Sequence, residues 1–83
     1  MTRLERYSEV ALTRDFPEYR LKQGDIATPV EYVDHPAGGE QGCILEVFNV
    51  LGESIDVITV PVSGVALLRA DQVPSARSLA RTA

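Results

Sequence analysis

Three polar side chains that could bind a metal ion or take part in acid–base chemistry lie in one short loop. They are Asp34, His35 and Glu40, within the segment DHPAGGEQG. Metal ligands need support from surrounding hydrogen bonds, and a glycine-rich loop supplies little rigidity. His35 is also the only histidine, so Ser–His or Cys–His catalysis would depend on one loop residue. We interpret the segment as a solvated polar loop and predict no catalytic residue, no metal site and no cofactor.

The single cysteine, Cys43, alternates with Leu45 and Val47 in CILEVFNV. Alternation along a strand places these three side chains on one face, so we predict a buried, inert thiol rather than a nucleophile. One cysteine forms no internal disulfide, which agrees with a reducing compartment. The first residues, MTRLERYSEV, carry charges where a signal peptide needs an apolar stretch, and we therefore expect a cytoplasmic protein.

Acidic residues dominate the middle of the chain. The net charge is −4, and residues 23–68 contain seven acids and no lysine or arginine. We predict that Glu31, Glu46 and Asp56 lie on outward faces of their strands, and if those strands are neighbours, the three carboxylates form one acidic face. Such a face repels phosphate groups and attracts basic partners. Partner binding and simple solubility are both open explanations for it.

Alternating apolar and polar residues indicate the elements that must position these side chains. Strands are expected within 9–14, 25–33, 43–50 and 54–62, with a last short strand and one helical turn within 65–73. Four or five short strands without a convincing long helix predict an all-β fold, a small SH3-like barrel of about five antiparallel strands. The chain reads as a single domain, 1–83, with the barrel at about 9–73 and a frayed or marginally helical tail at 74–83.

Local signals refine this picture. Gly24 and Asp25 are predicted to form the turn into the second strand, the glycine for its backbone freedom and the aspartate for a hydrogen bond to nearby amides. Pro29 lacks the N–H of a central strand, so it predicts a bend or an edge. Thr2 and Glu5 fit a capping box for a short helical turn. The predicted core consists of Val10, Leu12, Leu21, Ile26, Val30, Leu45, Val47, Ile58, Val60 and Leu67.

Three segments carry a resemblance to a family of short, uncharacterised bacterial proteins, a domain of unknown function with an SH3-like barrel fold. The segments are ALTRDFPEYRLKQGDIATPVEYVD, LEVFNVLGE and VITVPVS with LLRADQV, and the similarity runs from about 10 to about 73. The family pattern D-x-P-E, L-x-x-G-D and an acidic residue between apolar ones is matched by Asp15, Pro17, Glu18, Leu21, Gly24, Asp25 and Glu46. Ala27 stands where the family often has a second glycine. About a dozen residues around the G-D turn also resemble KOW-type modules of ribosomal and transcription proteins.

These observations favour a non-enzymatic module that binds another protein, with a basic protein as one candidate, through the acidic face or an exposed barrel edge. Nucleic-acid binding, the function that a KOW-type resemblance implies, is the alternative. It is disfavoured because phosphate contacts need lysine and arginine on the binding strands, and 23–68 has none. A small enzyme is the least favoured reading. A homodimer through an edge strand is also open, because association could supply core area that a small domain lacks.

Overall fold

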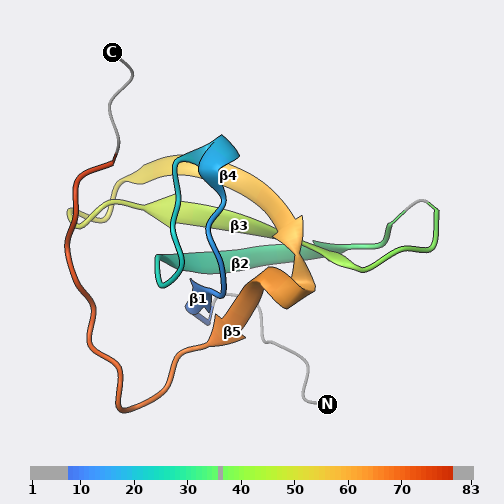
Figure 1. The fold of residues 1–83 in the computed structure, drawn as a ribbon. Helices are drawn as coiled ribbons and strands as arrows, with labels where there is room; N and C mark the ends of the chain where they lie inside the picture. The colour runs from blue at the N-terminus through green and yellow to red at the C-terminus, as the bar shows by residue number, and fades with distance from the viewer. Residues whose placement is uncertain (1–7, 36, 80–83) are drawn as a thin grey trace.

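Five antiparallel strands form one sheet in the computed structural model, which describes residues 8–35 and 37–79 (Figure 1). The strands follow the order β4-β3-β2-β1-β5 across the sheet. This arrangement confirms the predicted all-β fold, a small SH3-like barrel of five strands. The elements are β1 (Val10–Leu12), η1 (Pro17–Tyr19), β2 (Ile26–Val33), β3 (Gly42–Phe48), β4 (Ser54–Pro61), η2 (Val62–Gly64) and β5 (Val65–Leu67), where η marks a 3-10 turn.

The hairpin of β3 and β4 supplies much of the core. Cys43, Leu45 and Val47 alternate inward from β3, and Ile58 and Val60 face them from β4. The sheet has one buried face here, so the period of two in the sequence sufficed to predict these positions. Val10, Leu12 and Leu21 complete the part of the core that was predicted correctly.

The facing of β2 differs from the prediction. Ala27 and Pro29 are buried, whereas Ile26 and Val30, which were expected in the core, are only half-buried. Apolar residues occupy both faces of this strand, so the pattern did not determine the register. The strand does bend near Pro29, as expected, because the pairing with β3 shifts register between Pro29 and Glu31. Pro29 also lies beyond the two residues of β2 that pair with β1, where an absent N–H removes no bond to that strand.

Leu67 is likewise not a core residue, because 46% of it is exposed. Val65 lies on the same face of β5, pairs with Leu12 of β1 and is the buried residue of this strand. The strand ends after three residues, and within the described part of the tail, 68–79, it is followed by a single hydrogen-bonded turn, in which the Gln72 amide donates to the Arg69 carbonyl over 3.1 Å, and not by a longer helix. The capping box suggested for Thr2 and Glu5 lies outside the described residues. No helix in 8–35 or 37–79 is long and apolar enough to cross a membrane.

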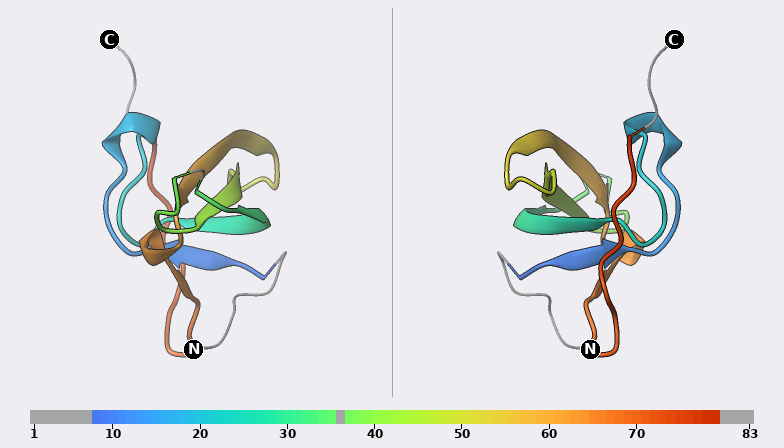
Figure 2. Two further views of the ribbon diagram at one scale, coloured as in Figure 1. Left: turned by 90° about the vertical axis from the view of Figure 1, so that its right-hand side faces the viewer. Right: turned by 90° about the vertical axis from the view of Figure 1, so that its left-hand side faces the viewer.

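A long loop between β1 and β2 stands to one side of the barrel (Figure 2). It contains η1 and is closed by a pair of backbone hydrogen bonds between Phe16 and Leu21. The Phe16 ring is buried in the core, although its place next to Pro17 in a loop gave no periodic signal. The Tyr19 hydroxyl donates to the Thr59 carbonyl over 3.1 Å and so ties the loop to β4.

Candidate interaction surface

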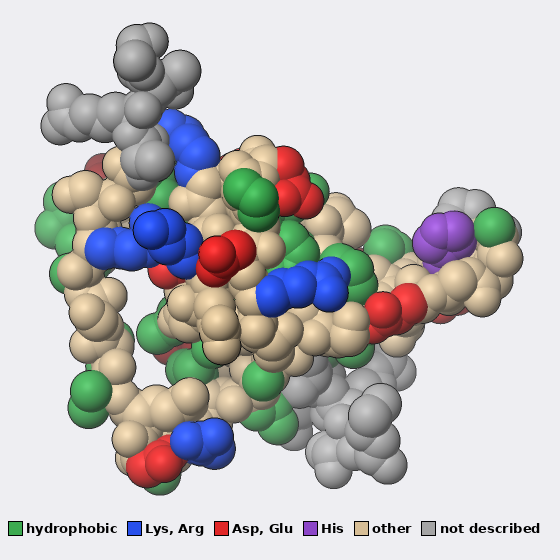
Figure 3. Space-filling view, viewed as in Figure 1, with side chains coloured by type: hydrophobic (Ala, Val, Ile, Leu, Met, Phe, Trp, Pro, Cys, Tyr) green, Lys and Arg blue, Asp and Glu red, His purple; other side chains and the backbone are tan. Residues whose placement is uncertain are grey.

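Five exposed apolar side chains gather at the end of the β3–β4 hairpin, and we call this set the hairpin face. Exposure reaches 85% for Val50, 80% for Leu51 and 59% for Val57. Figure 3 shows hydrophobic side chains at the end of the molecule where this hairpin turns. Contiguous exposed apolar side chains rimmed by polar ones are typical of interaction sites. The hairpin face consists of Phe48, Val50, Leu51, Ile55 and Val57.

Hydrogen bonds within the turn hold the loop residues of the hairpin face in place. The Asn49 side-chain oxygen accepts from the amides of Leu51 and Glu53, both at 3.0 Å. The Asn49 side-chain nitrogen donates to the Glu53 carboxylate over 2.8 Å. Gly52 has φ +82°, a conformation that favours glycine, and its amide donates to the Asn49 carbonyl. The turn therefore presents its apolar side chains on an ordered frame, which lowers the entropy cost of binding.

The predicted acidic face is only partly assembled. The strands that carry Glu31, Glu46 and Asp56 are neighbours in the sheet, which meets the condition for a shared face. Glu46 alternates with the buried residues of β3 and pairs with Val57, and Glu31 pairs with the outward Ile44, so both lie on the outer face.

Asp56 corrects the expectation of one continuous face. It is exposed but pairs with the inward-facing Val47, so it lies on the same side of β4 as Ile58, at the rim of the barrel. The β3–β4 register shifts only beyond this pair, between Val47 and Phe48. Asp56 therefore adds negative charge near the hairpin face without sharing the outer face with Glu46.

The outer edge of β4 is partly closed by side chains. The Asp56 carboxylate accepts from the Val57 amide over 2.9 Å, and the Thr59 carbonyl accepts from Tyr19. These two backbone groups belong to alternate residues, so both point to the edge that β3 does not cover. An edge strand in which some backbone hydrogen-bonding groups are already occupied is a poorer template for a further strand. The side-chain face of the hairpin is thus better suited to contact a partner than its backbone edge.

Two side chains of the loop between β2 and β3, those of His35 and Glu40, accept hydrogen bonds. His35 Nδ1 accepts from the Ala37 amide over 3.0 Å, and Glu40 accepts from both the amide and the hydroxyl of Ser63. An open depression of about 300 Å³ lies beside this loop and includes Asp34 in its lining. Among the described residues, no group of three potential ligands is placed to hold a metal ion.

The Cys43 thiol is buried, as the alternation predicted. Burial penalises the thiolate and raises the pKa of Cys43 above its ordinary value of 9.0. A thiol in this state is a weak nucleophile at neutral pH.

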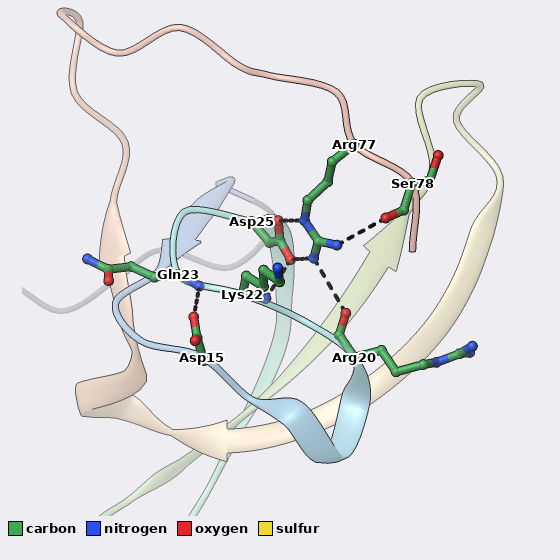
Figure 4. A network of polar contacts seen from close by, with 7 residues as sticks. All are labelled: Asp15, Arg20, Lys22, Gln23, Asp25, Arg77 and Ser78. Atoms are coloured by element: carbon green, nitrogen blue, oxygen red, sulfur yellow. Dashed lines mark hydrogen bonds and ion pairs between the residues drawn. The ribbon is translucent and has the colours of Figure 1, made fainter. Parts of the chain in front are cut away.

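The predicted turn residues lie in a network that also includes the C-terminal tail (Figure 4). Gly24 has φ +92°, and the Asp25 carboxylate accepts from the Lys22 amide over 2.8 Å. The guanidinium of Arg77 makes a two-pronged contact with the same carboxylate, through Nε at 3.1 Å and through Nη2. This contact raises the pKa of Arg77, chiefly through its hydrogen bonds to Asp25. No sequence signal pointed to Arg77, because its partner lies 52 positions away.

Sequence reasoning also missed the hairpin face, although one signal for it existed. The turn NVLGE contains two large apolar residues at positions where turns are usually polar.

No protein-family model, curated protein or solved structure matches the chain.

Proposed function

We propose that the protein is a non-enzymatic interaction module that binds another protein through the hairpin face. The observation that carries the proposal is the presence of five exposed apolar side chains on one ordered hairpin. Large apolar side chains that pack at the centre of an interface supply most of its binding energy. An ordered hairpin can offer them without a folding step.

The charges around the hairpin face identify the kind of partner. Glu46, Glu53 and Asp56 lie on or next to the hairpin, and residues 23–68 contain no lysine or arginine. A partner surface with an apolar centre and a rim of lysine or arginine would complement this arrangement. Two copies of the same hairpin face would instead bring like charges together, so we favour a different protein over a homodimer.

The remaining functional alternatives are less well supported. Nucleic-acid binding would place phosphates against strands that carry acids and no bases. The resemblance to short, uncharacterised bacterial proteins implies no activity and is compatible with a binding role. A cytoplasmic location is part of the proposal and is compatible with the single, unpaired Cys43 thiol.

Affinity capture from an extract of the native host, compared across variants, tests the proposal. Val50→Ser and Val57→Ser each remove an apolar side chain that is already exposed, so the fold should persist. Val73→Ser is the matched control, because Val73 is 87% exposed but lies in the tail. A protein retained by the wild type and the control, lost from both hairpin variants and released by salt would support the proposal. Identical captured proteins for all four chains would contradict it.

Sedimentation of the purified chain tests the alternative that a second copy of the chain binds the hairpin face. The proposal expects a monomer at every concentration. A concentration-dependent dimer that Val57→Ser abolishes would assign the hairpin face to a second copy and overturn the hetero-partner proposal.

A further inference from the structure

The tail returns to the barrel and places one cationic side chain on the turn before β2. Arg77 bonds both carboxylate oxygens of Asp25, and its Nη2 also donates to the Arg20 carbonyl over 3.4 Å. The two side chains are 31% and 23% exposed, so the contact is partly shielded from water. Two-pronged guanidinium–carboxylate contacts are geometrically specific in a way that a lysine contact is not.

The receiving side of this contact is built by the barrel alone. The Asp25 carboxylate is oriented by the Lys22 amide, and Asp15 holds the adjacent Gln23 amide over 2.9 Å. Two backbone hydrogen bonds fix the turn against β1. The Leu12 amide donates to the Asp25 carbonyl, and the Gly24 amide donates to the Leu12 carbonyl. The turn is therefore held in position by bonds that do not involve the tail.

The tail, by contrast, is attached weakly. Within 73–79, the polar contacts with the barrel in the described part of the chain all come from the Arg77 side chain. Residues 73–79 are all exposed, including Pro74 and Ser75 on the approach to Arg77. Figure 3 shows the tail standing away from the body of the barrel with an open gap between them. A tail whose polar contacts with the barrel come from one side chain can be displaced by a competing ligand of the same chemistry.

We propose that Asp25 and the Arg20 carbonyl form an arginine-binding site, which Arg77 occupies in the free protein. In a complex, an arginine from an extended basic segment of a partner protein replaces Arg77 and frees the tail. The acidic middle of the chain favours the approach of such a segment. This site is separate from the hairpin face and does not depend on the function proposed for it.

A synthetic peptide with the sequence QVPSARSL, residues 72–79, provides the probe. Its binding to the full-length chain is followed by the amide NMR shifts of residues 20–25. The Arg77→Ala chain should bind the peptide saturably, and the wild type about two- to tenfold more weakly, because its own tethered arginine competes at an effective concentration on the order of millimolar. Arg69→Ala is the matched control, since Arg69 pairs with the exposed Asp71 in the tail, and it should behave as the wild type.

Two further chains and a second peptide separate the proposal from a non-specific charge effect. The peptide with alanine in place of its arginine should not shift these amides. The double variant Asp25→Asn/Arg77→Ala should lose peptide binding. The side-chain oxygen that remains after Asp25→Asn can still accept from the Lys22 amide, and a thermal melt checks that the fold is retained. Val57→Ser should bind the peptide as the wild type does, so failure of the hairpin proposal would leave this result unchanged. Equal peptide affinity for the wild type and Arg77→Ala, or binding that is independent of the peptide arginine, would overturn the proposal.

Discussion

The Phe16 ring lies directly against Gly64. A Cβ atom built on Gly64 would come within 2.7 Å of Phe16 Cζ, a separation that real side chains do not adopt. Both residues are buried, and they join the loop after β1 to the 3-10 turn between β4 and β5. This contact packs the loop after β1 against η2, the turn that connects the two edge strands, β4 and β5.

Gly64→Ala should therefore destabilise the fold by about 1–3 kcal/mol, as expected when a methyl group is forced into a packed core. Gly39→Ala is the control, because the three atoms nearest to its new methyl, at 3.0–3.2 Å, all belong to the exposed His35 side chain, which can shift at the cost of at most its hydrogen bond from the Ala37 amide. Urea unfolding measures both free energies. Equal stability of the two variants would show that Phe16 moves aside at little cost.

Gly24→Val should also lower the free energy of unfolding, by about 1–3 kcal/mol, because Gly24 has φ +92° and β-branched residues avoid that region. No atom lies within 4 Å of the position that a Cβ atom on Gly24 would take, so the cost is conformational rather than steric. Gly24→Asn, which tolerates positive φ, should recover part of the loss. A thermal melt in which valine and asparagine behave alike would refute this explanation.

Cys43 should react slowly with a thiol reagent in the folded protein and rapidly in denaturant, because its thiol is buried. Its raised pKa also predicts a direction for stability. Below pH 9.0, the ordinary pKa, the thiol is protonated in both states. At higher pH the unfolded chain releases the proton first, so the stability contributed by the neutral thiol is lost as pH rises. The wild type should lose stability relative to Cys43→Ala as pH rises through and above 9.0, and parallel curves would contradict the predicted shift.

Replacing Glu31 and Glu46 with glutamine and Asp56 with asparagine should leave the melting temperature nearly unchanged. Glutamine at position 31 and asparagine at position 56 still offer a side-chain oxygen to the amides of Tyr32 and Val57. Exposed charges also contribute little to stability. Association with a captured partner should slow and lose part of its salt dependence. Stopped-flow measurements at low and high salt provide the comparison. The same rate and salt slope as the wild type would leave solubility as the only role of these charges.

Asn49→Ala should loosen the hairpin turn, because it removes a side-chain oxygen that accepts two amides. Each lost bond is worth about 0.5–1.5 kcal/mol, and hydrogen exchange of the Leu51 and Glu53 amides should become faster. Asn49→Asp keeps the acceptor and should protect these amides better than alanine does. If the turn orders the hairpin face for binding, Asn49→Ala should also weaken capture of the partner, whereas unchanged exchange would show that Gly52 and the strands suffice.

The sequence alone determined the strand content and the facing of the strands that have one buried side. In β3 and β4, less buried residues alternate with Cys43, Leu45, Ile58 and Val60, and this period of two leaves one register that buries the apolar set. The turn at Gly24 and Asp25 was also readable, because its chemistry is local.

The tertiary structure decided what depends on contacts between distant residues. In β2, apolar residues on both faces left the choice between Ala27 and Ile26 to the pairing with β1 and β3. The rim position of Asp56 follows from its pairing with Val47. The contact of Arg77 with Asp25 joins residues 52 positions apart, and no periodicity or turn signal extends that far. Local sequence patterns predict which face of a strand is buried. Contacts between residues far apart in the sequence form only when the strands pair in the folded sheet.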